Sequence, residues 1–131
     1  MSRSTKFRGQ REDTKEWAIG YLIEWKVVYG KEHKELKHVS VVMSNGELDI
    51  GMVEVIPETV GQFTGRTDDG GDELYDGDII SFDYELHGYE GVIEWSEALS
   101  AFVVKRKDKD PLFLYDIDDA VTKLGNVYDI D

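Results

Sequence analysis

Short apolar runs separated by turn residues recur along the chain, most clearly in its second half. There, alternation with polar residues places four apolar residues on one face of a strand: Ile80, Phe82, Tyr84 and Leu86. Further strands are expected at 91–95, 101–105 and 124–128. No connection between them is long enough for a crossover helix, so the strands should pair antiparallel. The pattern predicts an all-β protein whose C-terminal half forms a small barrel.

The turn Asp76-Gly77-Asp78 leads directly into the strand of residues 79–82. Glycine is favoured in such a turn because it adopts positive φ without steric cost. Gly88 is expected to allow the turn to the following strand.

The N-terminal half carries a second group of strand signals. Trp17–Tyr29 is rich in β-branched and aromatic residues and predicts one or two strands. Asn45-Gly46 lies between two apolar runs, which predicts a hairpin with a type I′ turn. Residues 31–38 are mostly charged and are expected to form a loop or an exposed tip. Pro57 should end an extended segment and begin a short helical turn.

Residues 1–16 are polar and charged, with Phe7 as their one large apolar residue. Lys6-Phe7-Arg8 is compatible with a short edge strand or with a partly ordered arm, and the sequence leaves both open.

The charge of the chain is unevenly distributed. Of the net charge of −13, residues 1–40 contribute +3, with nine Lys or Arg against six Asp or Glu. Residues 41–131 contribute −16, with six Lys or Arg against twenty-two Asp or Glu. Because nucleic-acid affinity comes mostly from neutralising phosphates, the acidic body is not expected to bind DNA or RNA. Its charge suits a solvated surface, a basic protein partner or imitation of nucleic acid.

Composition narrows the compartment and the chemistry. The chain has no cysteine, which removes disulfides, thiolate metal sites and cysteine nucleophiles. No apolar run approaches the roughly 18–20 residues of a membrane span, and no apolar segment of a secretory signal follows the N-terminus. A cytoplasmic protein is therefore expected, with no membrane partner.

Five motifs, in order and spanning nearly the whole chain, resemble the YopX family, small proteins of phages and prophages. They are Lys6-Phe7-Arg8, Gly61-Gln62-Phe63-Thr64-Gly65, Glu73-Leu74-Tyr75-Asp76-Gly77-Asp78-Ile79-Ile80, Gly91-Val92-Ile93-Glu94-Trp95 and Leu124-Gly125-Asn126-Val127-Tyr128.

The resemblance implies an SH3-like barrel at 72–131, preceded by a strand-rich region at 1–71 in one compact unit. It also implies a phage or prophage origin and hence the cytoplasm of a bacterial host. Gly9-Gln10 follows Arg8 where the family usually has an aromatic residue, so the packing of the first segment departs from the family pattern. The family supplies no catalytic residues to carry over.

Neither metal binding nor catalysis has a supporting motif. Residues 68–72 resemble a calcium loop but lack its alternating Asp spacing and distal Glu, so an acidic turn is favoured. The three histidines, His33, His38 and His87, lack metal-ligand spacing and should be exposed. No serine lies in a nucleophile elbow, and no phosphate loop is present. We expect a protein that is not an enzyme and that needs no cofactor or metal.

The candidate site rests on aromatic residues near turns. Tyr75 and Tyr89 are expected to be partly exposed and to form a contact surface, flanked by three acidic residues: Asp76, Asp78 and Glu90. Aromatic rings with an acidic rim suit a basic protein segment. Three other aromatic residues are expected to fill the core: Phe82, Trp95 and Phe102.

The leading prediction is a non-enzymatic phage accessory protein that binds a host-encoded protein. One alternative is a nucleic-acid-associated protein that acts through a basic N-terminal arm made of Arg3, Lys6, Arg8, Arg11 and Lys15. A second alternative is a self-assembling component, in which the arm packs on a neighbouring copy.

Overall fold

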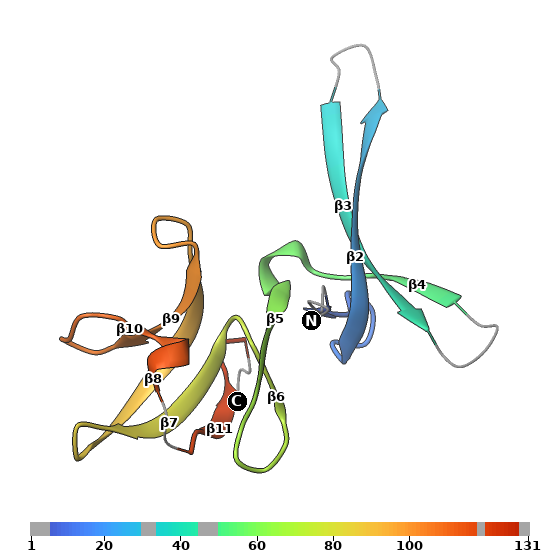
Figure 1. Cartoon of the computed structure of the whole chain (residues 1–131). Helices are drawn as coiled ribbons and strands as arrows, with labels where there is room; N and C mark the ends of the chain where they lie inside the picture. Colours follow the sequence, from blue (N-terminus) through green and yellow to red (C-terminus); the bar gives the residue numbers. More distant parts are fainter. Residues whose placement is uncertain (1–5, 30–33, 45–49, 118–119, 129–131) are drawn as a thin grey trace. The chain divides into compact units, whose positions relative to one another are not determined.

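The computed structural model describes residues 6–29, 34–44, 50–117 and 120–128, with side chains described outside 23–52 (Figure 1). The chain contacts divide into two compact units, Ser2–Gln62 and Phe63–Asp131. Antiparallel strands make up most of both units, which confirms the all-β prediction. Neither of the short helical turns among these residues is long or apolar enough to cross a membrane.

The described residues of the first unit form four complete strands and one 3-10 turn: β1 (Phe7–Gln10), β2 (Trp17–Tyr29), β3 (Lys34–Ser44), β4 (Ile50–Glu54) and η1 (Pro57–Thr59). The strand order is β4-β3-β2-β1, and β1 also pairs with the start of β5 (Gly61–Thr67). β1 is therefore an interior strand. Both predictions for the N-terminal segment, an edge strand and a partly ordered arm, are wrong.

A long hairpin joins β2 and β3, which pair from Tyr21↔Val42 to Tyr29↔Lys34 (Figure 1). The prediction of a loop or tip across residues 31–38 is wrong for 34–38, which belong to β3. β propensity depends strongly on the neighbouring strand, and the partner here is rich in β-branched and aromatic residues.

The hairpin predicted from Asn45-Gly46 is confirmed by the pairing of β3 with β4, which closes at Ser44↔Ile50. The turn residues 45–49 lie outside the described residues. The predicted helical turn is confirmed as η1, with Pro57 at its first position.

The small core of the first unit explains the unusual residue after Arg8. A side chain at Gly9 would overlap Val55, since its Cβ would lie 2.8 Å from Val55 Cγ2. Val55 and Ala18 are both about 1% exposed. Glycine at position 9 therefore lets β1 approach the core closely, and Arg8 packs with its guanidinium 4.7 Å from the centre of the Trp17 ring.

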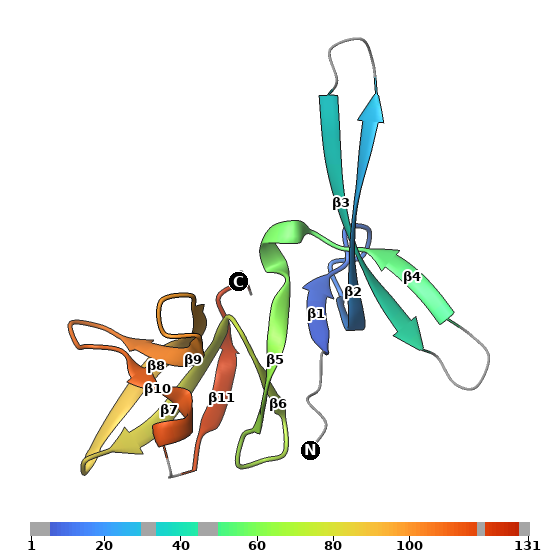
Figure 2. The same ribbon diagram turned by 45° about the horizontal axis from the view of Figure 1, so that its top comes forward.

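In its described residues, the second unit contains the rest of β5, six further strands and a second 3-10 turn (Figure 2). These elements are β6 (Glu73–Tyr75), β7 (Asp78–Tyr84), β8 (His87–Ser96), β9 (Ala101–Arg106), β10 (Leu112–Phe113), η2 (Leu114–Asp116) and β11 (Thr122–Asn126). The sheet order is β10-β9-β8-β7-β11. No pairing joins β10 to β11 in the part of the chain that the structure describes, so the predicted barrel is not closed.

The turn between β7 and β8 differs from the prediction. Tyr84 pairs with His87, so Glu85 and Leu86 form the two-residue loop, with φ of 50° and 71°. Leu86 is fully exposed instead of sharing the core face with Ile80. Gly88 lies within β8. The loop adopts the positive φ angles of a type I′ hairpin without glycine, which is why the sequence pattern missed it.

The core of the second unit lies against β7, β8 and β9. Its buried residues are Leu74, Ile80, Phe82, Ile93, Val104, Leu114, Ile117 and Val121. The alternating burial along β7 and β8 matches the period of two that the sequence shows. The placement of Phe82 in the core is confirmed, at 4% exposed.

Replacing Gly91 with alanine should destabilise the second unit. A Cβ at this buried position would overlap Val104 Cγ1 and lie 2.9 Å from the backbone oxygen of Lys105. Because that oxygen belongs to the paired strand β9, we expect Gly91→Ala to lower the free energy of unfolding by about 1–3 kcal/mol, the usual cost of overpacking. Chemical denaturation measures the change. Gly70→Ala is the control, since the nearest atom to its Cβ would be Asp68 Oδ1 at 3.5 Å; equal effects would contradict the packing argument.

Candidate functional site

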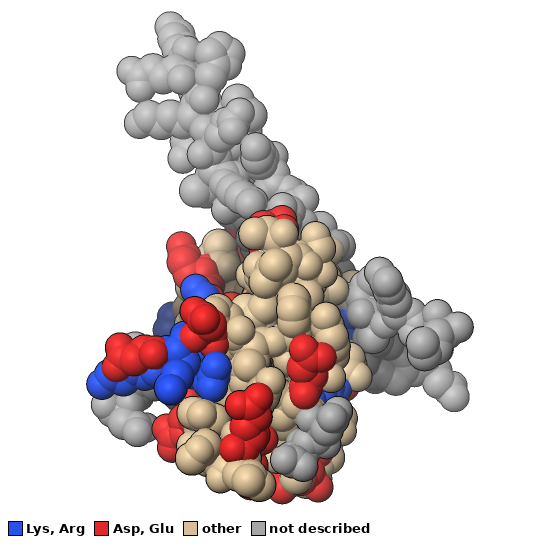
Figure 3. Space-filling view, turned by 60° about the vertical axis from the view of Figure 1, so that its left-hand side comes forward, with Lys and Arg blue, Asp and Glu red and all other residues tan. Residues whose placement is uncertain are grey.

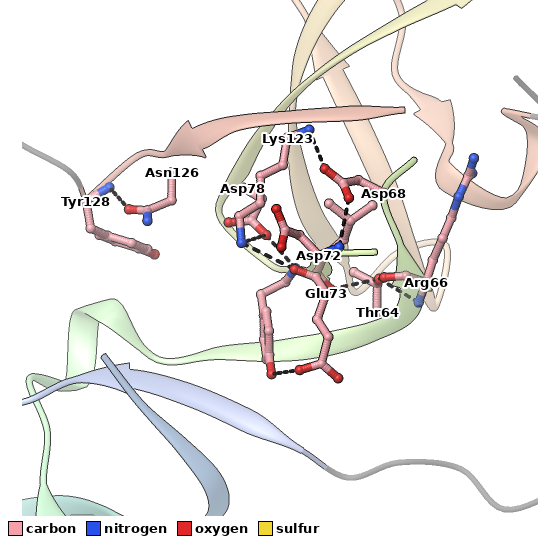
Figure 4. Close-up of polar contacts among 11 residues, drawn as sticks. Thr64, Arg66, Asp68, Asp72, Glu73, Asp78, Lys123, Asn126 and Tyr128 are labelled. Atoms are coloured by element: carbon pink, nitrogen blue, oxygen red, sulfur yellow. Dashed lines mark hydrogen bonds and ion pairs between the residues drawn. The ribbon is translucent and has the colours of Figure 1, made fainter. Parts of the chain in front are cut away.

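Two residues of the sequence-predicted contact surface lie inside the fold. Asp78 is 0% exposed, and its Oδ2 accepts a hydrogen bond from the Tyr75 amide at 2.7 Å. The same oxygen lies 3.3 Å from Lys123 Nζ, so the carboxylate connects β6, β7 and β11 (Figure 4). Gly77 occupies the turn with φ of 94°. The motif around Asp78 therefore has a structural role in joining three strands.

Tyr75 is 2% exposed, so the expectation that it is partly exposed is wrong. Its hydroxyl donates to Glu73 Oε1 at 3.1 Å, and its ring lies 5.5 Å from that of Phe63. The period of two along β6 places Tyr75 and Leu74 on opposite sides of the strand, and both are covered. A neighbouring turn is thus a poor indicator of exposure when the turn itself is packed. Asp76, within that turn, is half-buried.

Asp68 closes the loop between β5 and β6. Its Oδ1 accepts from the amides of Gly70 and Asp72, and its Oδ2 accepts from the amide of Lys123 at 3.1 Å (Figure 4). The hydrogen bond from Lys123, followed by that from Asp72, lowers the pKa of the Asp68 carboxyl. Both oxygens thus serve the loop itself, in agreement with an acidic turn.

The other two predicted residues lie on β8. Tyr89 is half-buried, and the guanidinium of Arg106 lies 4.7 Å from the centre of its ring. Glu90 is exposed. Both line an open hollow of about 520 Å³ beside Ser81, Asp83 and Thr122. Because Tyr75 and Asp78 are buried, the five predicted residues do not form one exposed surface.

A different set of residues forms an aromatic groove in the second unit. The groove has a volume of about 350 Å³ and is lined by Thr64, Gly65, Arg66, Trp95, Ser100, Ala101, Phe102, Leu114 and Tyr115. These residues come from β5, the turn between β8 and β9 together with the strand ends beside it, and η2. We call this feature the aromatic groove. Figure 3 shows a broad, mostly uncharged area that carries a few acidic side chains, with most of the visible Lys and Arg side chains at its left.

Polar contacts hold the two walls of the groove. Arg66 Nη1 donates to the backbone oxygens of Leu114 at 3.0 Å and Ile117 at 2.7 Å, which fixes η2 against β5. Thr64 Oγ1 donates to the Leu74 oxygen at 2.8 Å and anchors the same segment of β5 to β6. The groove is therefore built from backbone that is tied in place.

Two aromatic pairs line and border the groove. Trp95 and Phe102 meet edge to face, with ring centres 5.1 Å apart. Tyr115 stacks on Phe113 at 5.0 Å. Trp95 is 41% exposed and Tyr115 is 68% exposed, so large aromatic surfaces face the solvent at two sides. Aromatic pairs of this kind are rigid and offer a large apolar area.

The expectation that Trp95 fills the core is wrong. It follows Ile93 by two positions on β8, but the strand ends at Ser96 and the core does not extend that far. Phe102 is partly buried against the core, as expected. The available sequence signal was the position of Trp95 beside the turn Ser96-Glu97-Ala98, at the end of its strand.

Removal of the buried Asp78 carboxylate should lower the stability of the second unit. We expect Asp78→Ala to lower the free energy of unfolding by about 3–5 kcal/mol, because it leaves the Lys123 ammonium without its buried partner. Urea denaturation followed by circular dichroism measures this. Asp83→Ala, an exposed position on the same strand, should change stability by less than about 0.5 kcal/mol. Similar losses in the two variants would show that burial of Asp78 does not matter.

The lowered pKa of Asp68 predicts a pH dependence. Its ionised form is favoured in the folded state, so its contribution is present above the unfolded pKa of about 3.9 and is lost as pH falls through the lower folded pKa. We expect Asp68→Asn to be less stable than the wild type at neutral pH and to approach it in stability below about pH 3.9. Urea midpoints across this range test the prediction, and a gap that stays constant with pH would contradict it.

Comparison with known proteins places the chain in a family. The model of the YopX protein family matches residues 6–130. No curated protein and no solved structure matches the chain. The family match covers both units and includes the Asp78 turn and the residues of the aromatic groove. The chain therefore belongs to the YopX family.

Proposed function

We propose that this YopX-family protein is a non-enzymatic accessory protein of a phage or prophage that binds another protein through the aromatic groove. The observation that carries the proposal is the pair of exposed rings, Trp95 and Tyr115, at a groove whose lining is mainly apolar. The cytoplasm of the bacterial host is its place of action, and a host-encoded protein is its target.

The groove has the composition of a protein contact. Tryptophan, tyrosine and arginine dominate the binding energy of many protein interfaces, and all three line this groove. Its volume of about 350 Å³ suits one or two side chains of a partner. The rings are pre-positioned by Phe102 and Phe113, which reduces the entropy that binding would cost.

The lining also supports a non-enzymatic role. Among the lining residues, Thr64 donates its hydroxyl hydrogen bond to the Leu74 backbone and Arg66 binds two carbonyls. The remaining hydroxyls are Ser100 and Tyr115, and the lining contains no histidine or carboxylate that could activate them as a general base.

Nucleic-acid binding by the basic arm is less well supported. Arg8 is 4% exposed and packs on Trp17, while Arg11 forms two hydrogen bonds with Asp13 at 2.9 Å. Lys15 Nζ donates to the backbone oxygen of Glu12. These cations are engaged within the unit, which leaves less charge for phosphates.

A capture experiment tests the proposed function. Purified wild-type protein and the variant Trp95→Ala/Tyr115→Ala are immobilised and incubated with nuclease-treated host lysate. We expect a defined protein partner to bind the wild type and to be lost, by about tenfold or more, from the variant, because two interface aromatics each contribute on the order of 1–2 kcal/mol. Quantitative mass spectrometry measures the difference.

Tyr21→Ala is the matched control, since Tyr21 is an exposed tyrosine (65%) of the first unit, outside the groove. It should keep full capture. Equal capture by wild type and the groove variant would overturn the assignment to the groove. A partner captured only from a parallel sample of untreated lysate would favour nucleic acid, and an oligomer without a captured partner would favour self-assembly.

A further inference from the structure

We infer that the aromatic groove takes an arginine side chain of the partner, held against Trp95 and Tyr115. This inference rests on the proposed function, and it specifies the chemistry of the occupant. Three observations carry it. Arginine side chains cover other aromatic rings of the chain, the second unit has a negative net charge, and Arg66, the cation in the groove lining, is hydrogen-bonded to backbone oxygens.

The chain itself covers other aromatic faces with guanidinium groups. Arg8 lies 4.7 Å from the ring centre of Trp17, and Arg106 lies 4.7 Å from that of Tyr89. Arg106 also lies 6.0 Å from the ring centre of Tyr84. Within the described residues, no cation of the chain covers Trp95 or Tyr115, whose ring contacts are with Phe102 and Phe113. The groove therefore offers aromatic rings for a cation–π contact, whereas Trp17 and Tyr89 already make such a contact with an arginine of the chain.

The charge of the second unit favours a cation. Phe63–Asp131 contains eighteen Asp or Glu and six Lys or Arg, a formal net charge of −12. Glu97 follows Trp95 by two positions and Asp116 follows Tyr115 directly, and both are exposed. Neither takes part in an ion pair within the described part of the chain. Two exposed carboxylates thus lie close to the rings in the sequence, in a unit whose net charge is negative.

Arg66 is the cation that opposes this conclusion, because it lines the groove. Its Nη1 donates to the oxygens of Leu114 and Ile117, at the negative ends of two carbonyl dipoles. This single positive charge is outnumbered by the carboxylates of Glu97 and Asp116 and by the net charge of −12 of the second unit. The net charge therefore favours a positive ligand, and an experiment should measure which sign of ligand charge the groove prefers.

Arginine suits this surface better than lysine does. Its planar guanidinium stacks on an aromatic face while its N–H groups donate sideways to carboxylates. A lysine ammonium is more strongly hydrated and has no planar face. The two exposed rings offer flat faces for this stacking, and Glu97 and Asp116, close to them in the sequence, supply exposed carboxylates.

A charge series of peptides tests the inference with the full chain. The probes are the acetylated, amidated tetrapeptides Leu-Arg-Leu-Arg, Leu-Gln-Leu-Gln and Leu-Glu-Leu-Glu, with Leu-Lys-Leu-Lys as a fourth. Binding is followed by the nuclear magnetic resonance signal of the Trp95 indole N–H, assigned with Trp95→Phe, which detects even millimolar affinity. We expect the arginine peptide to bind about fivefold or more tightly than the glutamine peptide, and the glutamate peptide to bind weakest.

Variants of Glu97 and Asp116 provide a second test of the inference. In Glu97→Gln/Asp116→Asn, the preference for arginine over glutamine should fall to about twofold or less. Glu85→Gln, an exposed acidic position in the β7–β8 turn, should leave the preference unchanged. Added salt should weaken the arginine peptide more than the glutamine peptide.

Three results would overturn the inference: equal binding of arginine and glutamine peptides, tighter binding of the glutamate peptide, or no change of the Trp95 signal with the arginine peptide. The tests separate it from the proposed function. If lysate capture depends on Trp95 and Tyr115 but the peptide series shows no preference for arginine, the groove binds a protein through another side chain. If capture does not depend on the groove, the proposed function fails, whatever the peptides show.

Discussion

The buried carboxylate of Asp78 is the contact on which the second unit depends. It accepts the Tyr75 amide and pairs with Lys123, so it links β6, β7 and β11 at one point. A buried charge costs several kcal/mol of desolvation unless it is paired and hydrogen-bonded. The turn at Gly77 supplies the backbone geometry, and its amide donates to the Ile93 oxygen at 2.8 Å. The strands around the core are thereby held in register from one end.

Polar contacts in the same unit also position the aromatic groove. β5 is tied to β6 through Thr64, and η2 is tied to β5 through Arg66. Since Asp68 in the following loop also accepts the amide of Lys123, the segment that carries Arg66 is anchored at both ends. The aromatic groove thus lies on backbone held by polar contacts, while its rings stay exposed. A rigid frame with exposed aromatic residues is what a binding surface requires.

Sequence patterns predicted the elements well where the period of two was regular, as in β7 and β8, and where a glycine marked a turn, as at Gly77. They failed where neighbours decide the outcome. The charged residues 34–38 form a strand because a long, β-prone partner pairs with them. Tyr75, expected to be partly exposed, is buried, whereas Trp95, expected to fill the core, is exposed. The reason is that exposure depends on how far the core extends along each strand. Burial at strand ends is a tertiary property that no local pattern contains.

The distribution of cations over rings connects the fold to the proposed activity. Arg8 and Arg106 each cover an aromatic face inside their own unit, which removes both the charge and the ring from contact with other molecules. Most of the acidic charge of the second unit has no such cationic partner, because Asp and Glu outnumber Lys and Arg there by eighteen to six. An excess of carboxylates costs folding energy through repulsion, and a bound cation relieves that repulsion. A partner that brings arginine to Trp95 and Tyr115 would therefore gain both from the rings and from the field of the whole unit.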